Sequence, residues 1–275
     1  MTQITRAVNE PILSFAAGSS ERASLQAKYD EMATQTIEIP LIIDGKEIKT
    51  GDMGNCVMPH NHQHVLATYH KAGETEVIQA IDVAMKSWKT WSTTTLEERT
   101  KIFRKAAELL QGPWRDTINA ATMLNQSKNA FQAEVDAACE LIDFFNFNAQ
   151  YAEEITANQP LISPEGMHNH LEYRPLEGFV FAITPFNFTS IAGNLPSAPA
   201  LMGNVALWKP ASSAVLPCYY IMKMLEEAGL PAGVINFIPG SGGNVGNPVL
   251  SNSNLAGVHF TGSTATFHHI WKTIG

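Results

Sequence analysis

The sequence predicts a doubly wound α/β fold, and three observations support this prediction. After residue 177, short apolar runs alternate with helical patterns, as expected for parallel strands joined by crossover helices. The run from Gly178 to Thr184 is apolar along almost its whole length, which favours a strand buried on both faces of a sheet. The chain of 275 residues is also long enough to bury a sizeable core.

Residues 176–210 have the pattern of one strand–helix–strand unit. The expected order is a strand at 178–184, a turn at 186–188, a helix from residue 189 or 190 to about 202, and a strand at 205–208. Pro196 and Pro199 lie inside the expected helix and predict a kink or a break there. Both strands carry polar side chains only at their carboxyl ends, where open α/β sheets bind ligands.

The remaining elements follow from capping residues, turn signals and apolar spacing. Asp44-Gly45 between two apolar runs predicts a tight hairpin over residues 39–50. A loop and a short strand are expected at 59–69, and further strands at 234–238 and 257–260. Helices are expected from residue 19 or 20 to 33, at 74–91, 95–110, 114–123, 129–158, 215–228 and 246–251, and from 264 onward.

Composition excludes several classes of protein. Apolar residues make up 45% and charged residues 16% of the chain, as in a globular protein, and no apolar run is long enough to cross a membrane. The start, MTQITRAVNEP, lacks the pattern of a secretory signal or a transit peptide. The net charge of −8 argues against nucleic acid as a partner. Three widely spaced cysteines indicate a reducing compartment. We therefore expect a cytoplasmic location, or the mitochondrial matrix in a eukaryote.

Three residues at the strand ends are candidates for chemistry, and each has a plainer interpretation. Asn187 could donate its amide hydrogen bond to a developing oxyanion, although from spacing alone an ordinary turn asparagine is the commoner case. Phe188 could line a substrate pocket or simply pack the turn. Lys209 could donate to ribose hydroxyls or be a surface lysine.

Glycines follow two further strands. Gly240-Ser241-Gly242-Gly243 precedes a helix and suits a nucleotide phosphate, but through residue 246 it reads G-x-G-G-x-x-G, which is not the dinucleotide fingerprint. Gly262-Ser263 is a second junction where backbone N–H groups could bind pyrophosphate. The alternative for the first glycine cluster is a mobile turn, and the alternative for Gly262-Ser263 is a plain helix cap.

A metal site is not expected. Cys56, His60, His62 and His64 lie close in sequence, but their spacing matches no zinc pattern. Glu140 lies on the long expected helix, either as a partly buried carboxylate or on the solvated face.

Four sequence blocks together resemble the cofactor-binding half of the aldehyde dehydrogenase superfamily. They are GFVFAITPFNFT, GNVALWKP, EEAGLPAGVINFIPGSG and HFTGS. A finer resemblance is to the L-glutamate γ-semialdehyde dehydrogenase family, also called Δ1-pyrroline-5-carboxylate dehydrogenase. It is carried by NEPILSF, AEVDAACELIDFFNFNAQYA, FNFTSIAGNLPSAPALMGN and FTGSTATFHHIWK, and it covers the chain from about residue 8 onward.

The resemblance implies a Rossmann-like domain that uses NAD to oxidise an aldehyde, here L-glutamate 5-semialdehyde, to L-glutamate in proline degradation. It implies Asn187 as the oxyanion donor, and Glu140 and Phe188 as substrate neighbours. The implied cofactor contacts are Thr184, Pro185, Lys209, Ser212, Gly240, Gly262 and Ser263.

The implied organisation has three parts within this chain. Residues 1–159 are the amino-terminal part of the cofactor-binding domain, 160–175 belong to an oligomerisation arm, and 176–275 are the Rossmann-like core. The arm implies a homo-oligomer. The partners expected are thus a small aldehyde and other copies of the protein, with no nucleic acid and no membrane.

The sequence departs from the family at two places. Many NAD-using relatives carry an acidic residue at the position of Ser212, so the choice between NAD and NADP stays open. The family's nucleophile is a cysteine in a Gly-Gln-x-Cys context, and Cys56, Cys139 and Cys218 have other surroundings. The chain is therefore expected to be an amino-terminal fragment without the catalytic-cysteine region, inactive and poorly soluble alone. A non-catalytic cofactor-binding remnant and a dehydrogenase for another semialdehyde are the alternatives.

Overall fold

A computed structural model describes residues 6–275 of the chain. Residues 1–5, which belong to the stretch compared with signal and transit peptides, lie outside the described residues. Two sheets are present, and their strands are β1 (Ile37–Ile39), β2 (Leu41–Ile43), β3 (Lys46–Ile48), β4 (Met53–Met58), β5 (Asn61–His70), β6 (Phe179–Ile183), β7 (Val205–Lys209), β8 (Ile235–Phe237) and β9 (Leu255–Phe260).

Helices account for most of the remaining chain. They are α1 (Ser20–Ala33), α2 (Glu74–Trp91), α3 (Leu96–Gln111), α4 (Arg115–Gln126), α5 (Ala130–Ala133), α6 (Glu140–Ala157), α7 (Thr189–Leu201), α8 (Val215–Glu227), α9 (Gly242–Leu250) and α10 (Thr264–Ile274). A π-helical turn, Glu134–Cys139, joins α5 to α6. None of the helices in residues 6–275 combines the length and apolar character needed to span a bilayer.

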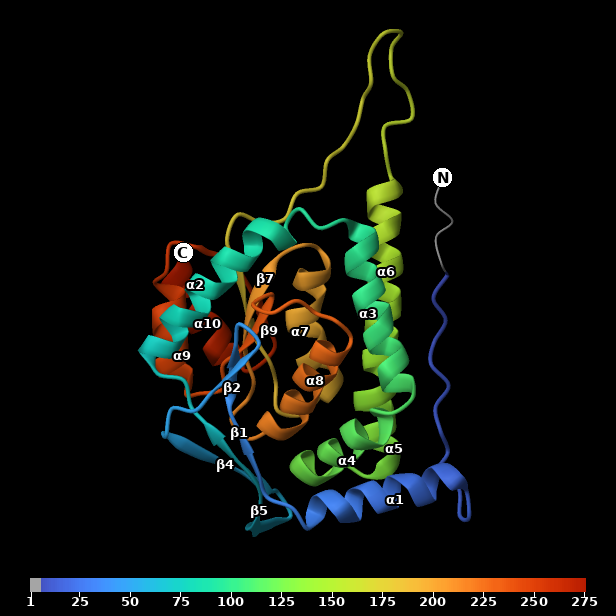
Figure 1. The fold of residues 1–275 in the computed structure, drawn as a ribbon, viewed down its shortest axis with the longest axis vertical. Helices are drawn as coiled ribbons and strands as arrows, with labels where there is room; N and C mark the ends of the chain where they lie inside the picture. Colours follow the sequence, from blue (N-terminus) through green and yellow to red (C-terminus); the bar gives the residue numbers. More distant parts are fainter. Residues whose placement is uncertain (1–5) are drawn as a thin grey trace.

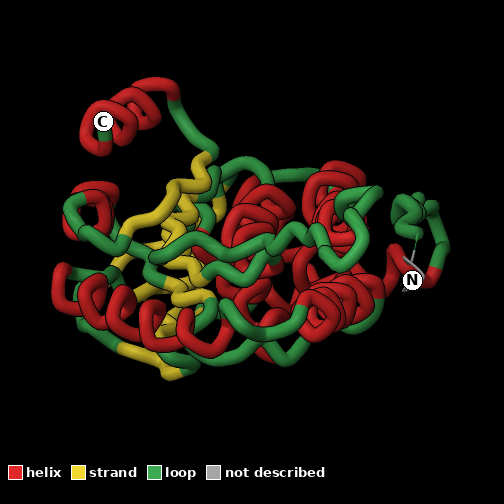
Figure 2. The backbone as a smooth tube through the Cα atoms, turned by 90° about the horizontal axis from the view of Figure 1, so that it is seen from above, coloured by secondary structure: helices red, strands yellow, loops and turns green. Residues whose placement is uncertain are grey.

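The larger sheet confirms the expected α/β fold. Its strand order is β3-β2-β8-β7-β6-β9, and β8, β7, β6 and β9 are parallel to one another. Helix α2 packs on one face, and α7 and α8 lie on the other (Figures 1 and 2). Strands β7 and β8 follow β6 on one side of it, and β9 then lies on its other side. The strand order therefore reverses at β6, and ligands bind in the crevice that such a switch point creates.

The predicted hairpin is present but is smaller than expected. Strands β2 and β3 pair with a left-handed turn at Asp44 (φ 58°) and Gly45 (φ 68°), as a two-residue hairpin requires. The hairpin extends the larger sheet, because Ile42 pairs with Phe237 of β8. Ile39 instead belongs to β1, which pairs with β5 in the smaller sheet.

The expectation of a loop and a short strand at 59–69 was wrong. The second sheet has the order β1-β5-β4, and the long strand β5 pairs with β4, which was not predicted. Two register shifts interrupt that pairing, between Cys56, Val57 and Met58. Bulges of this kind break the two-residue alternation from which strands are recognised.

The long helix expected at 129–158 is confirmed, but it is not uniformly α-helical. Asn129 caps it through a hydrogen bond accepted from the Gln132 N–H, and the π-helical turn follows one α-turn later. Glu134 in this turn is fully buried and ion-paired with Arg115 of α4. This buried pair lies between elements distant in sequence, so apolar spacing alone does not reveal it.

Helices α7 and α9 also differ from expectation. Pro196 and Pro199 do not break α7, which runs uninterrupted, because its buried residues pack between α6 and the sheet. Helix α9 begins at Gly242 rather than at Gly246, since the Ser241 hydroxyl accepts from the Asn244 N–H and caps it. Glycine-rich first turns are poor helix formers, and the cap compensates for this.

The arm is the most exposed part of the described chain. Residues 158–178 contain no helix or strand, and they project from the end of α6 in Figure 1. Leu161 and Ile162 in this segment are 100% and 78% exposed. Apolar side chains exposed to this degree favour contact with another surface.

Candidate functional site

The first element of the site is the end of β6. Phe179 and Phe181 are buried on this strand, and Thr184 directly after it is 2% exposed. The Trp208 indole N–H of β7 donates to the Thr184 hydroxyl at 3.1 Å, which ties the two strand ends together. Pro185 then ends the strand, and Asn187 lies exposed in the turn that follows.

The second element is Lys209 at the end of β7. It is only 8% exposed, and its ammonium donates to the Pro210 carbonyl at 3.1 Å. Among the described residues no carboxylate pairs with it. Burial therefore lowers the pKa of Lys209. An ammonium has three donors, so this side chain can still donate to a ligand.

A cleft of about 1000 Å³ joins these strand ends to α9 and α10. It brings together six of the residues predicted from sequence, namely Thr184, Pro185, Asn187, Lys209, Gly262 and Ser263. Two more, Ser212 and Gly240, adjoin it without lining it, and the Ser212 hydroxyl donates to the Gly240 carbonyl at 3.4 Å. Gly242 and Gly243, from the glycine cluster noted in the sequence, also line it. Other parts of the wall were not predicted, including Asn247, Leu250, His269 and Ile270.

Two helix amino termini open onto the cleft. Ser263 caps α10, with its hydroxyl accepting from the Thr266 N–H at 3.2 Å. Gly242, Gly243 and Gly246 of α9 line the opposite side. One cap satisfies only part of the free N–H groups of a first turn, and the helix dipole adds positive potential. The cleft thus combines donors and positive charge in the way that phosphate groups need.

Glu140 and Phe188 do not line this cleft. The Ser190 hydroxyl of α7 donates to Glu140 Oε2 at 2.7 Å. The Lys128 ammonium lies 4.1 Å from the centroid of the Phe188 ring. Asn187 lines the cleft, whereas its neighbour Phe188 does not.

The three thiols are structural in this chain. Cys56, Cys139 and Cys218 are free and buried. Burial raises the pKa of Cys56 and of Cys139 to about 12, and it also raises the pKa of Cys218. A nucleophilic cysteine needs a lowered pKa, so none of these thiols suits that role.

The histidines near Cys56 form no metal centre in the described chain. The His60 ring hydrogen-bonds through Nδ1 to the Ser127 hydroxyl at 2.7 Å. No cluster of three His, Cys, Asp or Glu side chains with metal-binding proximity occurs in residues 6–275.

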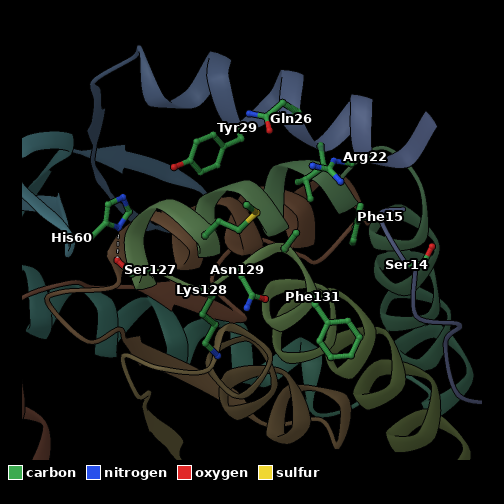
Figure 3. Close-up of a pocket in the computed structure, with 13 residues that line it drawn as sticks. Ser14, Phe15, Arg22, Gln26, Tyr29, His60, Ser127, Lys128, Asn129 and Phe131 are labelled. Atoms are coloured by element: carbon green, nitrogen blue, oxygen red, sulfur yellow. Dashed lines mark hydrogen bonds between the residues drawn. The ribbon is translucent and has the colours of Figure 1, made fainter. Parts of the chain in front are cut away.

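A second cavity, of about 680 Å³, lies between α1 and the α4–α5 connection (Figure 3). Arg22, Gln26 and Tyr29 project into it from one face of α1, and Ser127 and Phe131 lie across from them. None of the residues predicted to act on substrate or cofactor lines this cavity. Six of the predicted site residues line the first cleft instead.

Comparison with known proteins agrees with this geometry. The family model described as "Aldehyde dehydrogenase family" matches residues 48–275. A protein of Schizosaccharomyces pombe named "Probable delta-1-pyrroline-5-carboxylate dehydrogenase" is 47% identical over 268 residues, which are 97% of this chain and 49% of that protein. The mitochondrial Δ1-pyrroline-5-carboxylate dehydrogenase of Dictyostelium discoideum is 49% identical over 265 residues, 96% of this chain and 48% of its own.

A solved structure is similar over the whole chain. The Δ-pyrroline-5-carboxylate dehydrogenase of Mycobacterium tuberculosis bound with NAD has a TM-score of 0.98 and 48% identity, and the match covers 100% of this chain and 51% of that one. The chain thus spans about half the length of the relatives it matches.

Proposed function

Because the chain belongs to the aldehyde dehydrogenase family, we propose that it is the cofactor-binding half of an NAD-dependent L-glutamate 5-semialdehyde dehydrogenase. The full-length protein would oxidise the semialdehyde, formed from 1-pyrroline-5-carboxylate, to L-glutamate in proline degradation. One observation carries the proposal: the cleft places Asn187 and the buried Lys209 on one wall, while relatives 45–49% identical are named for this reaction.

The cleft fits NAD through its donors. Lys209 would donate to the ribose hydroxyls, since its ammonium is buried with a single carbonyl acceptor. Gly262 and Ser263 would hold the pyrophosphate at the start of α10. A Cβ at Gly262 would lie 2.7 Å from the Phe260 ring, so any larger residue there requires this ring to move. NAD, when bound, supplies the hydride acceptor.

The remaining cofactor candidates have supporting roles in this proposal. Thr184 and Pro185 would form the wall beside the nicotinamide end. Ser212 and Gly240 are joined to each other by a hydrogen bond and would shape the rim near the adenosine. Ser212 brings no negative charge to repel a 2′-phosphate, so NADP is the alternative cofactor to be compared with NAD.

Asn187 would act directly on the reacting atoms. Its exposed amide would donate to the oxyanion that forms when a thiolate adds to the aldehyde. Glu140 and Phe188, on the other side of the turn, would contact the aldehyde. The thiolate would come from outside this chain, because all three of its cysteines are buried with raised pKa values.

The same comparison supports proposals about organisation. Residues 1–159 and 176–275 would form the two parts of the cofactor-binding domain, and the arm at 160–175 would join copies into a homo-oligomer. Exposed apolar residues in the arm favour such a contact. The Dictyostelium and rat relatives are named mitochondrial, which supports a mitochondrial location if the protein is eukaryotic.

A direct test replaces the proposed oxyanion donor. In the full-length protein, Asn187→Ala should lower kcat for glutamate semialdehyde by about 10²–10³, the usual effect of losing one such donor. The Kd for NAD, measured by titration, should change little. Unchanged turnover would refute the role of Asn187.

A non-catalytic, cofactor-binding protein is the second candidate, and the buried thiols favour it for this chain by itself. The 275-residue chain should then bind NAD and show no aldehyde oxidation. Turnover by this chain alone would refute the proposal that the nucleophile lies elsewhere. Reading the coding sequence past Gly275 separates the two candidates.

A further inference from the structure

The turn that carries Asn187 is braced by the residues that follow it. The Thr189 hydroxyl hydrogen-bonds to the Thr122 hydroxyl at 2.8 Å and accepts from Gln126 Nε2 at 2.9 Å. Both partners come from α4. The next residue, Ser190, donates to Glu140 of α6 at 2.7 Å. Helices α4 and α6 therefore fix the start of α7, directly after the turn.

Phe188 is held by a different group. The Lys128 ammonium lies 4.1 Å from the centroid of the Phe188 ring, which is within the range of a cation–π interaction. The same ammonium pairs with Asp136 Oδ2 at 2.5 Å. The Lys128 side chain is only 12% exposed and that of Asp136 21%, so water screens these contacts weakly.

Lys128 lines the second cavity, but its ammonium contacts the turn. In Figure 3, the ammonium points away from α1 and from the Arg22 and Tyr29 side chains. The groups that the ammonium contacts, Phe188 and Asp136, both lie outside the cavity lining.

The partner carboxylate comes from the π-helical turn. Asp136 lies within Glu134–Cys139, and Glu140 directly follows this turn. One irregular helix thus presents one carboxylate to Lys128 and another to Ser190. π-Helical turns are frequent at functional sites. Asp136 also compensates the charge of Lys128, so the ammonium can approach the ring without leaving an unpaired buried charge.

We propose that Lys128 is a positioning residue for the aldehyde side of the site. Paired with Asp136, it fixes the Phe188 ring and thereby the adjacent Asn187 amide. The kinetic consequence rests on the proposed function, whereas the contact itself is testable without any activity.

The contact is tested by 19F NMR on the full-length protein labelled with 4-fluorophenylalanine. The Phe188 signal is assigned by its loss in Phe188→Leu. Lys128→Met should shift that signal, and Lys128→Arg should return it toward its original position because a guanidinium also stacks on aromatic rings. The control is Lys105→Met, which removes an exposed lysine paired with Glu108 on α3. An unmoved Phe188 signal in Lys128→Met overturns the proposal.

The kinetic test separates positioning from general loosening. Lys128→Met should lower kcat/KM for the aldehyde by about 2- to 30-fold, the range expected for a cation–π contact. The KM for NAD should not change, because Lys128 is not part of the cofactor cleft. Lys128→Arg should recover most of the loss. A parallel rise in the KM for NAD would overturn the proposal.

Asp136→Asn provides a second variant that keeps the lysine and most of the side-chain volume. It should change the Phe188 signal and kcat/KM in the same direction as Lys128→Met. A wild-type protein without activity would refute the proposed function, while the NMR comparison would still decide the contact.

Discussion

Lys209 places a positive charge where little water reaches it. The side chain is 8% exposed, and no carboxylate within residues 6–275 neutralises it. Burial of an uncompensated ammonium is unfavourable. A buried ammonium at this position is best explained by a ligand whose hydroxyl groups accept hydrogen bonds from its remaining N–H donors.

Lys209→Met should therefore weaken NAD binding and leave the fold intact. Loss of charge-assisted hydrogen bonds is expected to raise the Kd by about tenfold or more. The melting temperature without NAD should stay equal or rise, since the desolvated charge is gone. Titration calorimetry and thermal melting measure both effects. Lys223→Met on α8, which removes a pair with Glu226, is the control. An unaltered Kd would contradict the ribose role.

The lowered pKa of Lys209 also predicts opposite pH trends. The folded chain loses this proton below the ordinary value of 10.5, so NAD affinity should fall as the pH rises toward 10.5. Between the two pKa values the unfolded chain holds more protons, and the stability contributed by this group therefore rises with pH. In Lys209→Met, the slope of log Kd against pH should be smaller.

Because the three thiols are buried, we expect them to react slowly with thiol reagents. Burial raises the pKa of Cys56 and Cys139 to about 12, so the native chain at pH 8 contains very little thiolate. A disulfide reagent should label the native chain far more slowly than the unfolded one. Because the folded state retains these protons, stability should also fall as the pH rises from 9 toward 12. Rapid labelling of a folded sample would contradict the burial.

At the scale of elements, the end of α8 depends on one glycine. Gly229 has a φ of 94°, and its N–H donates to the Glu226 carbonyl at 3.0 Å. This left-handed residue closes the helix, at the end of the range that the sequence predicted. No atom lies within 4 Å of a Cβ built there, so any penalty for alanine comes from the backbone conformation alone.

Gly229→Ala should lower the free energy of unfolding by about 1 kcal/mol. Gly246→Ala is the matched control, since a Cβ there also has open space but the residue lies within α9. Alanine at a helical position should be neutral or stabilising. Chemical denaturation measures the free energy of unfolding of both variants. Equal losses in the two would exclude the left-handed backbone of Gly229 as the cause.

The sequence predicted elements best where the signals were local. The capping box at Thr95 and Glu98 is present, and so are the β2–β3 turn and the start of α10 at Ser263. Strand β4 was missed because bulges interrupt its pairing with β5 and so break the two-residue alternation. The π-helical turn was missed because its buried Glu134 pairs with Arg115 of another helix. Capping and turn chemistry act over a few residues, whereas strand pairing and buried ion pairs do not.

At the scale of the whole molecule, one surface is apolar and open. Phe267, Trp271 and Ile274 of α10 are 47%, 66% and 53% exposed, and their spacing puts them on one helical face. Helix α10 stands apart from the other helices in Figure 2. Strand β9 beside it is the last strand of the larger sheet. Such surfaces favour association.

The 275-residue chain should therefore self-associate or precipitate. Trp271→Lys combined with Phe267→Ser should shift it toward a monomer, measured by light scattering after size-exclusion chromatography. Phe131→Ser removes a residue that is 60% exposed on α5 and should have little effect. A monomeric, cooperatively melting wild-type chain would contradict this prediction.

The sequence by itself determined the strand–turn–helix pattern that carries Asn187 and the strand end that carries Lys209, because apolar runs, prolines and caps are local signals. Only the tertiary structure decided that these two residues line one cleft and that Lys128 reaches Phe188. It also decided that all three thiols are buried. These facts depend on how strands pair and helices pack across long sequence separations, and no local pattern encodes such distances.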